Sequence, residues 1–188
     1  MFRQAALRSV PMAVHLYNDA DRAFDLAQRN LAALRSSAET GGFACSDVVG
    51  PPYAVRFCVG EPGQRRFVMV SVLAFDDSEH MVRLTTPVLK DVVQRRGRAL
   101  DFCNELTREN PAYPCILHET DEGSDLLIKQ CYPHDLLLTA PEFFRGKLGS
   151  LPSVASVTRD RAADVGLSGS VYEWSAADFW RLSTRSMF

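Results

Sequence analysis

Hydrophobic residues recur at helical spacing near the start of the chain and predict a helix over 18–42. Asn18 is its expected N-terminal cap, and Gly41-Gly42 suits the left-handed exit of a helix. The apolar stripe consists of Phe24, Ala27, Leu31 and Leu34. A stripe this narrow indicates that the helix packs on one partner surface, which we expect to be a sheet.

A second helical pattern predicts a helix over 98–108. Asn110-Pro111 ends it, because the residue before a proline is pushed out of helical geometry. Its apolar face consists of Ala99, Phe102, Cys103 and Leu106. Two short apolar runs follow, at 115–119 and 126–131, and the turn residues between them predict a hairpin.

Three strands are expected between these two helices. Positions 53–59 alternate, positions 67–75 are apolar on both faces as in a central strand, and positions 81–88 alternate less cleanly. Pro87 is expected to end the third strand or to place it at a sheet edge, since proline cannot donate a ladder hydrogen bond. The short loops between the strands predict antiparallel pairing.

The last third of the chain carries weaker signals. Residues 134–138 are expected to form a loop or a strand extension, and Thr139 with Glu142 matches a capping box for a third helix. Pro152 and nearby glycines are expected to break that helix near Leu151, before it resumes over 153–164. Residues 171–174 are a candidate strand, and Ser175 is expected to cap a short final helix.

These elements predict an α+β fold with a single five-stranded antiparallel sheet packed by helices, in the order α-βββ-α-ββ-α plus a C-terminal extension. The length of 188 residues suits one domain. Within it we expect an N-terminal arm over 1–17, a core over 18–151 and the extension over 165–188.

Composition and charge exclude few classes of function. The chain is 46% hydrophobic and 23% charged, as in an ordinary globular protein, and its net charge of −2 gives no overall field to attract nucleic acid or an anionic membrane. No apolar run approaches the roughly 20 residues that a membrane helix needs. The five cysteines form no CxxC motif, and we expect reduced thiols in a cytoplasmic protein.

The sequence offers no recognisable catalytic, metal or cofactor site. No two of the four histidines lie at a metal-binding spacing, and no phosphate-binding glycine motif occurs. His118 is expected to face solvent from a strand, and His134-Asp135 could orient a base but lacks a serine or cysteine in a nucleophile elbow. The acidic clusters at 76–79 and 121–122 are expected to be turns. We therefore expect no catalytic residue, no bound metal and no cofactor.

Two features are candidates for binding. Arg95, Arg96 and Arg98 could hold an anion, but without interleaved aromatic residues and at net negative charge a solvated face is the favoured interpretation. Trp174, Phe179 and Trp180 crowd the C-terminal segment, where aromatic side chains either dock on their own domain or anchor a partner. Docking on the domain is the favoured interpretation, and partner binding is the alternative.

Residues 98–110, which read RALDFCNELTREN, resemble the helix of YbjN-type proteins, where a similar run precedes a two-stranded hairpin. Thr86-Pro87-Val88 before it and the acidic turn at 121–124 after it also fit, and the resemblance covers 24–151. The chain departs from the family in the third helix, which is usually continuous, and in the tail after Ala163. The interrupting residues are Gly146, Gly149 and Pro152.

The resemblance implies a fold like that of class I type III secretion chaperones, which is often homodimeric, and it implies protein or peptide binding without catalysis. The leading hypothesis is a non-enzymatic, cytoplasmic, chaperone-like or regulatory homodimer that binds a polypeptide, and neither nucleic acid nor a membrane. The expected mode is addition of an extended segment to a sheet edge, with the strand that ends at Pro87 as the candidate edge. The alternatives are a small-molecule or nucleotide-binding regulatory domain that uses the arginines, an enzyme of unrecognised class, and a structural subunit of a larger complex.

Overall fold

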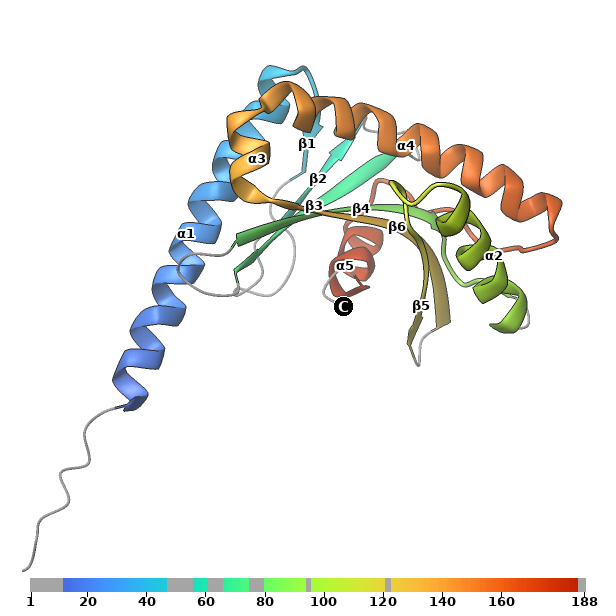
Figure 1. The fold of residues 1–188 in the computed structure, drawn as a ribbon, viewed down its shortest axis with the longest axis horizontal. Coiled ribbons are helices and arrows are strands. Elements are labelled where there is room, and N and C mark those ends of the chain that lie inside the picture. The colour runs from blue at the N-terminus through green and yellow to red at the C-terminus, as the bar shows by residue number, and fades with distance from the viewer. Residues whose placement is uncertain are drawn as a thin grey trace, which may run out of the picture.

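A computed structural model gives the structure of residues 12–46, 56–60, 66–74, 80–93, 96–120 and 123–185 (Figure 1). Residues 1–11 of the expected arm, residues 53–55 of the first expected strand, Arg95 and the acidic turns at 76–79 and 121–122 lie outside these ranges. The strands are β1 (Ala44–Cys45), β2 (Arg56–Gly60), β3 (Phe67–Ala74), β4 (His80–Leu89), β5 (Cys115–Thr120) and β6 (Gly123–Pro133). The helices are α1 (Met12–Thr40), α2 (Arg96–Glu109), α3 (His134–Thr139), α4 (Pro141–Asp164) and α5 (Ala176–Arg185).

The strands form one antiparallel sheet with the order β1-β2-β3-β4-β6-β5. The α+β class and the antiparallel pairing expected from the sequence are therefore confirmed. The expected count of five strands is wrong, because the two-residue strand β1 pairs with β2 and adds a sixth. Within the described ranges, β1 and β5 are the edge strands.

The expectation that Pro87 marks a strand end or a sheet edge is wrong. Pro87 lies inside β4, which pairs with β3 on one side and β6 on the other. The ladder with β3 extends only as far as Thr85, so the missing N–H of Pro87 removes no bond on that side. On the β6 side the register shifts between Pro87 and Leu89. This irregularity lets the strand continue past a residue that cannot donate a ladder hydrogen bond.

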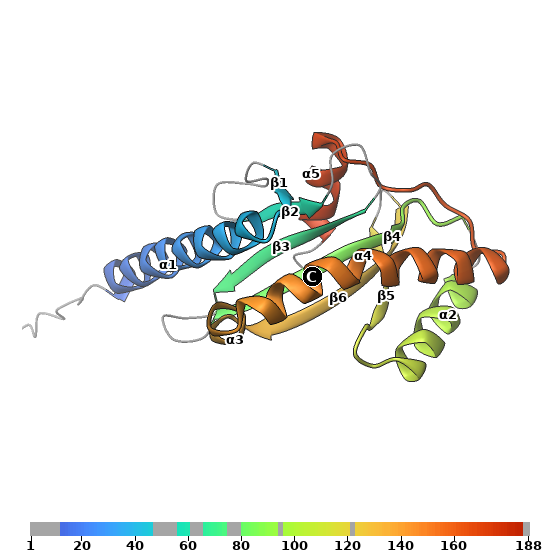
Figure 2. The same cartoon turned by 90° about the horizontal axis from the view of Figure 1, so that it is seen from above.

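The sheet separates two apolar layers. Alternating β3 side chains point to opposite faces, with Val68, Val70 and Val72 in a first core and Phe67 and Met69 in a second. Helices α1, α2, α3 and α4 lie on the side of the first core, whereas α5 lies on the opposite face (Figures 1 and 2). The C-terminal extension thus crosses from one face of the sheet to the other.

Helix α1 buries the expected stripe and ends at the expected glycines. Ala27, Leu31 and Leu34 are buried against the sheet. Gly42 has a φ of +83°, and the N–H of the next residue donates to the carbonyl of Ala38 at 3.1 Å, which closes the helix. The expected cap at Asn18 is wrong, because the helix already begins at Met12 and Asn18 lies inside it.

Helix α4 is continuous, so the break expected near Leu151 is wrong. The residues that it buries at helical spacing include Phe144, Leu148, Leu151 and Ala155. Burying a large apolar side chain contributes about 1.5–3 kcal/mol, so the three large members of this set outweigh the roughly 3 kcal/mol cost of Pro152 inside the helix. Gly146 and Gly149 face solvent, where they interrupt no packing.

The ends of the last three helices differ in part from the expectations. Residues 134–139 form the short helix α3 instead of a loop or strand. The capping box at Thr139 is wrong, because Thr139 ends α3 and its hydroxyl donates to the carbonyl of Asp135 at 2.6 Å. Residues 171–174 form no strand. The cap at Ser175 is confirmed, since its hydroxyl accepts the N–H of Asp178 at 3.2 Å.

Candidate functional site

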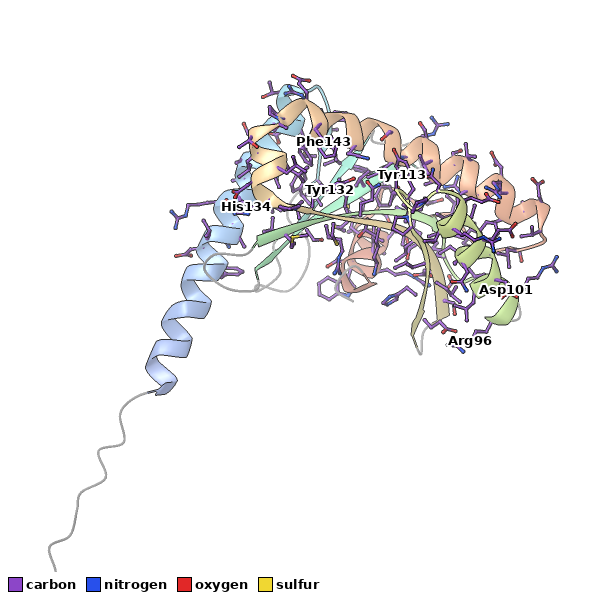
Figure 3. The ribbon with its side chains drawn as sticks, in the orientation of Figure 1. Arg96, Asp101, Tyr113, Tyr132, His134 and Phe143 are labelled. Carbon is purple, nitrogen blue, oxygen red and sulfur yellow. The ribbon has the colours of Figure 1, made fainter. Side chains whose placement is uncertain are left out.

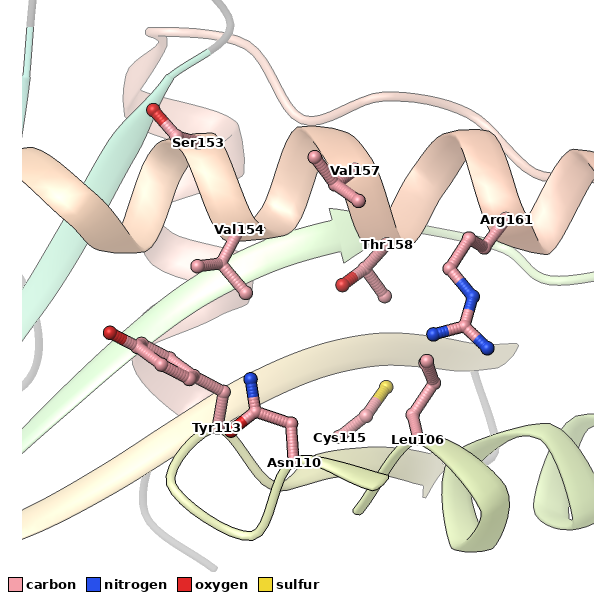
Figure 4. A pocket seen from close by; sticks show the side chains of 9 residues that line it. All are labelled: Leu106, Asn110, Tyr113, Cys115, Ser153, Val154, Val157, Thr158 and Arg161. Carbon is pink, nitrogen blue, oxygen red and sulfur yellow. The ribbon is translucent and has the colours of Figure 1, made fainter. Parts of the chain in front are cut away.

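A groove opens between α2 and α4 on the face of the first core (Figure 4). It arises because α2 packs on the edge strand β5, whereas α4 packs on β3 and β4 in the middle of the sheet. Its volume is about 310 Å³. The lining residues are Leu106, Asn110, Tyr113, Cys115, Ser153, Val154, Val157, Thr158 and Arg161.

The groove is lined mostly by apolar atoms, and one of its walls is exposed. Val154 and Thr158 project from α4 toward the α2–β5 side, and Val157 lies above them on the outer side of α4 (Figure 4). Val157 is 61% exposed, although large aliphatic side chains in a folded protein are mostly buried. The groove therefore presents apolar surface to solvent that no described part of the chain covers.

An ion pair bridges the two helices at one end of the groove. The Arg161 guanidinium donates to Glu109 Oε2 at 2.7 Å, and this hydrogen bond lowers the pKa of Glu109. Both side chains are about half exposed, so the pair links α2 and α4 at this end of the groove without adding much stability.

Aromatic rings surround a lysine at the other end. Lys147 Nζ lies 5.0 Å from the ring centre of Tyr113, 5.4 Å from that of Phe143 and 5.7 Å from that of Tyr132. Figure 3 shows these three rings between α4 and the sheet. The hydroxyl of Tyr132 donates to Gln130 on β6 at 2.9 Å, which fixes that ring. The cluster holds Tyr113 in place and so defines this end of the groove.

Two buried thiols meet beneath the groove. Cys103 Sγ on α2 lies 3.8 Å from Cys115 Sγ on β5, and only Cys115 lines the groove. The hydrogen bond between the two sulfurs lowers the pKa of Cys103, and the same bond, together with burial, raises the pKa of Cys115. Among the described residues, no group of three or more histidine, cysteine or carboxylate side chains could hold a metal ion.

The structure places the expected partner-binding aromatics on the opposite face of the sheet. Phe179 is buried, and Trp174 packs edge-on against Phe67 and Phe179 with ring centres 6.1 and 4.9 Å apart. Trp180 is 53% exposed. Two of the three side chains thus belong to the second core, and only Trp180 presents a ring to solvent.

A buried ionic network ties this C-terminal segment to the sheet. Asp125 on β6 is fully buried and accepts hydrogen bonds from the Tyr172 hydroxyl, from two nitrogens of Arg181 at 2.6 and 3.1 Å, and from the N–H of Asp91 at 3.0 Å. Asp91 has a φ of +54°, an uncommon conformation for a non-glycine residue, which these bonds hold in place. Beside this network, Lys90 pairs with Asp178 on α5 at 2.7 Å.

The expected anion-binding arginines and candidate histidines do not converge on one site. Arg96 Nε donates to both oxygens of Glu119, at 2.7 and 2.9 Å, and the Arg98 guanidinium lies beside Gly166. His134 lies 2.8 Å from the carboxylate of Asp135, at the opposite end of the sheet from Arg96 (Figure 3). His118 on β5 is half-buried.

Sequence reasoning missed the groove because its lining comes from segments that are ordinary one at a time. One signal was available. Val157 lies off the stripe that α4 buries at Leu151, Ala155 and Thr158, so it is an apolar residue on an otherwise solvated helix face.

None of the described helices is both long and apolar enough to cross a membrane. Comparison with protein-family models, with curated protein sequences and with solved structures gives no match to this chain. The expected kinship with the YbjN-like family therefore stays a prediction, and any functional conclusion has to come from the groove itself.

Proposed function

We propose that this protein is a non-enzymatic polypeptide-binding protein, chaperone-like or regulatory, and that the groove between α2 and α4 receives apolar side chains of its partner. The observation that supports the proposal is the exposed Val157 wall above the apolar floor that Leu106 and Cys115 form. An amphipathic segment that lays its apolar face into such a groove is a recurring mode of peptide recognition.

The size of the groove favours side chains of a polypeptide over a nucleotide. Its volume of about 310 Å³ lies at the lower limit of small-molecule sites, which span about 300–1,000 Å³. Its one cationic side chain, Arg161, is already paired with Glu109. The alternative of a nucleotide-binding regulatory domain therefore has no structural observation that favours it.

The proposal replaces the binding mode expected from the sequence. The strand that contains Pro87 is interior, so no segment can add to it. The edge strand β5 is partly closed as well, because the Thr107 hydroxyl on α2 accepts the N–H of Cys115 and donates to its carbonyl. Side-chain burial in the groove thus accounts for binding better than strand addition does.

Two matched substitutions test the proposal. Val157→Asp places a charge on the groove wall, and Val93→Asp places the same charge at a 71% exposed valine outside the groove. Both are surface changes, which cost within about 0.5 kcal/mol of folding stability. A random peptide library would be selected on the unmodified chain, and the enriched peptides would be measured by fluorescence anisotropy.

We expect the enriched peptides to carry apolar residues at i, i+3 or i+4 spacing. Burying a carboxylate against apolar surface costs at least about 1.4 kcal/mol, so Val157→Asp should weaken binding by tenfold or more, whereas Val93→Asp should leave it unchanged. Failure to enrich any peptide, or equal affinity for all three proteins, would contradict the proposal.

Homodimerisation, which the resemblance implies, is part of the proposal and is measured separately. Light scattering would give a solution mass about twice the 20.9 kDa of one chain. A mass of one chain at all concentrations would contradict the dimer. The proposal that the groove binds a polypeptide would not be affected.

A further inference from the structure

The backbone, and not only the side chains, holds the two thiols beneath the groove together. Cys103 and Thr107 lie one turn apart on α2, and the Thr107 hydroxyl bonds both the N–H and the carbonyl of Cys115, at 3.1 and 3.2 Å. These two hydrogen bonds fix the start of β5 against α2. The 3.8 Å contact between the sulfurs is therefore set by the way α2 docks on the sheet.

The pair differs from the other three thiols in being both paired and reachable. Cys115 lines the open groove, so a small reagent can approach its sulfur although both thiols are only 4% exposed. Cys58 is buried in the second core beside the Met69 sulfur, and Cys131 is exposed. Cys45 is half-buried on β1, at the opposite edge of the sheet from β5.

We propose that Cys103 and Cys115 are a redox-modification site, which forms an intramolecular disulfide when a low-molecular-weight disulfide enters the groove. A disulfide bond is about 2.05 Å long, so the sulfurs have to approach by about 1.8 Å from their present contact. The site does not depend on polypeptide binding, because it rests on the geometry of the two thiols and on access through the groove.

The reaction is a pair of thiol–disulfide exchanges. A thiolate of the pair attacks one sulfur of the reagent RSSR, the reagent S–S bond breaks, and RS⁻ leaves with the thiol proton as RSH. The second protein thiol then attacks the protein sulfur of the mixed disulfide and expels the second RSH. Two protein thiols are thus oxidised to one disulfide while RSSR is reduced to two RSH. The hydrogen bond between the two sulfurs lowers the pKa of Cys103, which favours Cys103 as the thiol that attacks in this second exchange.

Tryptic mapping tests the site on the full chain. Cys131→Ser removes the exposed thiol, and the folded protein is treated with 2-hydroxyethyl disulfide, quenched with acid and digested. Cleavage after Arg98, Arg108 and Lys129 places the two cysteines on separate peptides, 99–108 and 109–129. We expect these peptides to be recovered as one disulfide-linked species, with the intact mass lower by two hydrogens.

Two further variants define the outcomes. Adding Cys58→Ser should leave the linked species unchanged, whereas adding Cys103→Ser should stop the reaction at a mixed disulfide on Cys115. The proposal is overturned if Cys103 and Cys115 stay reduced under conditions in which the reagent modifies Cys131 of the unmodified chain. It is equally overturned if Cys115 carries the reagent thiol and no linked peptide forms.

Discussion

Replacing Arg181 by methionine should release the C-terminal helix from the sheet. Arg181 donates two hydrogen bonds to the carboxylate of Asp125, which has no exposed surface. Methionine keeps much of the side-chain volume but supplies neither donor nor charge. The Asp125 carboxylate would then be buried without the Arg181 charge, although it keeps two neutral donors, the Tyr172 hydroxyl and the Asp91 N–H.

Removing one partner of a buried ion pair costs about 3–5 kcal/mol. We expect about 3 kcal/mol here, at the lower end, because the Arg181 side chain is 20% exposed and so part of its charge is already solvated. An exposed pair provides the matched control. Arg161→Met breaks the bridge to Glu109, in which both side chains are about half exposed, and should cost less than about 1 kcal/mol.

The two tryptophans allow docking of α5 to be measured separately from global unfolding. Trp174 and Trp180 are the only tryptophans of the chain, and both lie in the C-terminal segment. In urea, fluorescence should therefore report α5 and far-UV circular dichroism the whole fold. For Arg181→Met we expect the fluorescence midpoint to fall by about 1 M urea or more and to precede the dichroism transition.

A double-mutant cycle with Asp125→Asn isolates the pair. The double variant should lose less unfolding free energy than the sum of the two single losses. The reason is that asparagine leaves no buried charge for Arg181 to compensate. An unchanged fluorescence midpoint in Arg181→Met, or strictly additive losses in the cycle, would refute the reasoning.

The remaining predictions concern the first core and the pH dependence of stability. Phe144→Ala should cost about 3–5 kcal/mol in urea unfolding, because that ring is fully buried, whereas Phe143→Ala, at a 39% exposed ring, should cost about 1 kcal/mol; equal losses would contradict the assigned burial. Burial and the Asp125 charge raise the pKa of Tyr172. This phenol therefore ionises at a lower pH in the unfolded chain than in the folded one, and the free energy of unfolding should fall as pH rises above about 10. Urea titrations at stepped pH should show a smaller fall for Tyr172→Phe. Burial and the Arg83 charge lower the pKa of Lys129 to about 8. Between about pH 8 and about 10.4 the unfolded state therefore binds more protons than the folded state, and the free energy of unfolding should rise with pH. The variant Lys129→Met should not show that rise.

Local patterns were enough to predict the elements that bury a regular stripe. The apolar spacing over 24–34 and 99–106 identified the buried faces of α1 and α2, and the glycines after α1 supplied its left-handed exit. The hairpin of β5 and β6 followed from two apolar runs around a turn. These features depend on residues close in sequence, so periodicity and turn chemistry determine them.

Proline positions were misread because their cost depends on distant neighbours. Pro152 stays inside α4 since the sheet buries Phe144, Leu148 and Leu151 along one face of that helix. Pro87 stays inside β4 since β3 has already ended beside it and a bulge absorbs it on the β6 side. Both outcomes rest on tertiary packing, which outweighs the local preference of the chain.

The sequence by itself determined the α+β class, the antiparallel pairing and most of the core, because alternation and helical spacing encode which face of each element is apolar. Only the tertiary structure decided that β6 inserts between β4 and β5, that α5 crosses to the far face, and that α2 and α4 leave a groove between them. Leu106, Cys115 and Val157 come from three separate elements. No local sequence pattern specifies that these three residues lie close together. Their proximity depends on the distance at which the sheet holds α2 and α4, which are not consecutive in the chain.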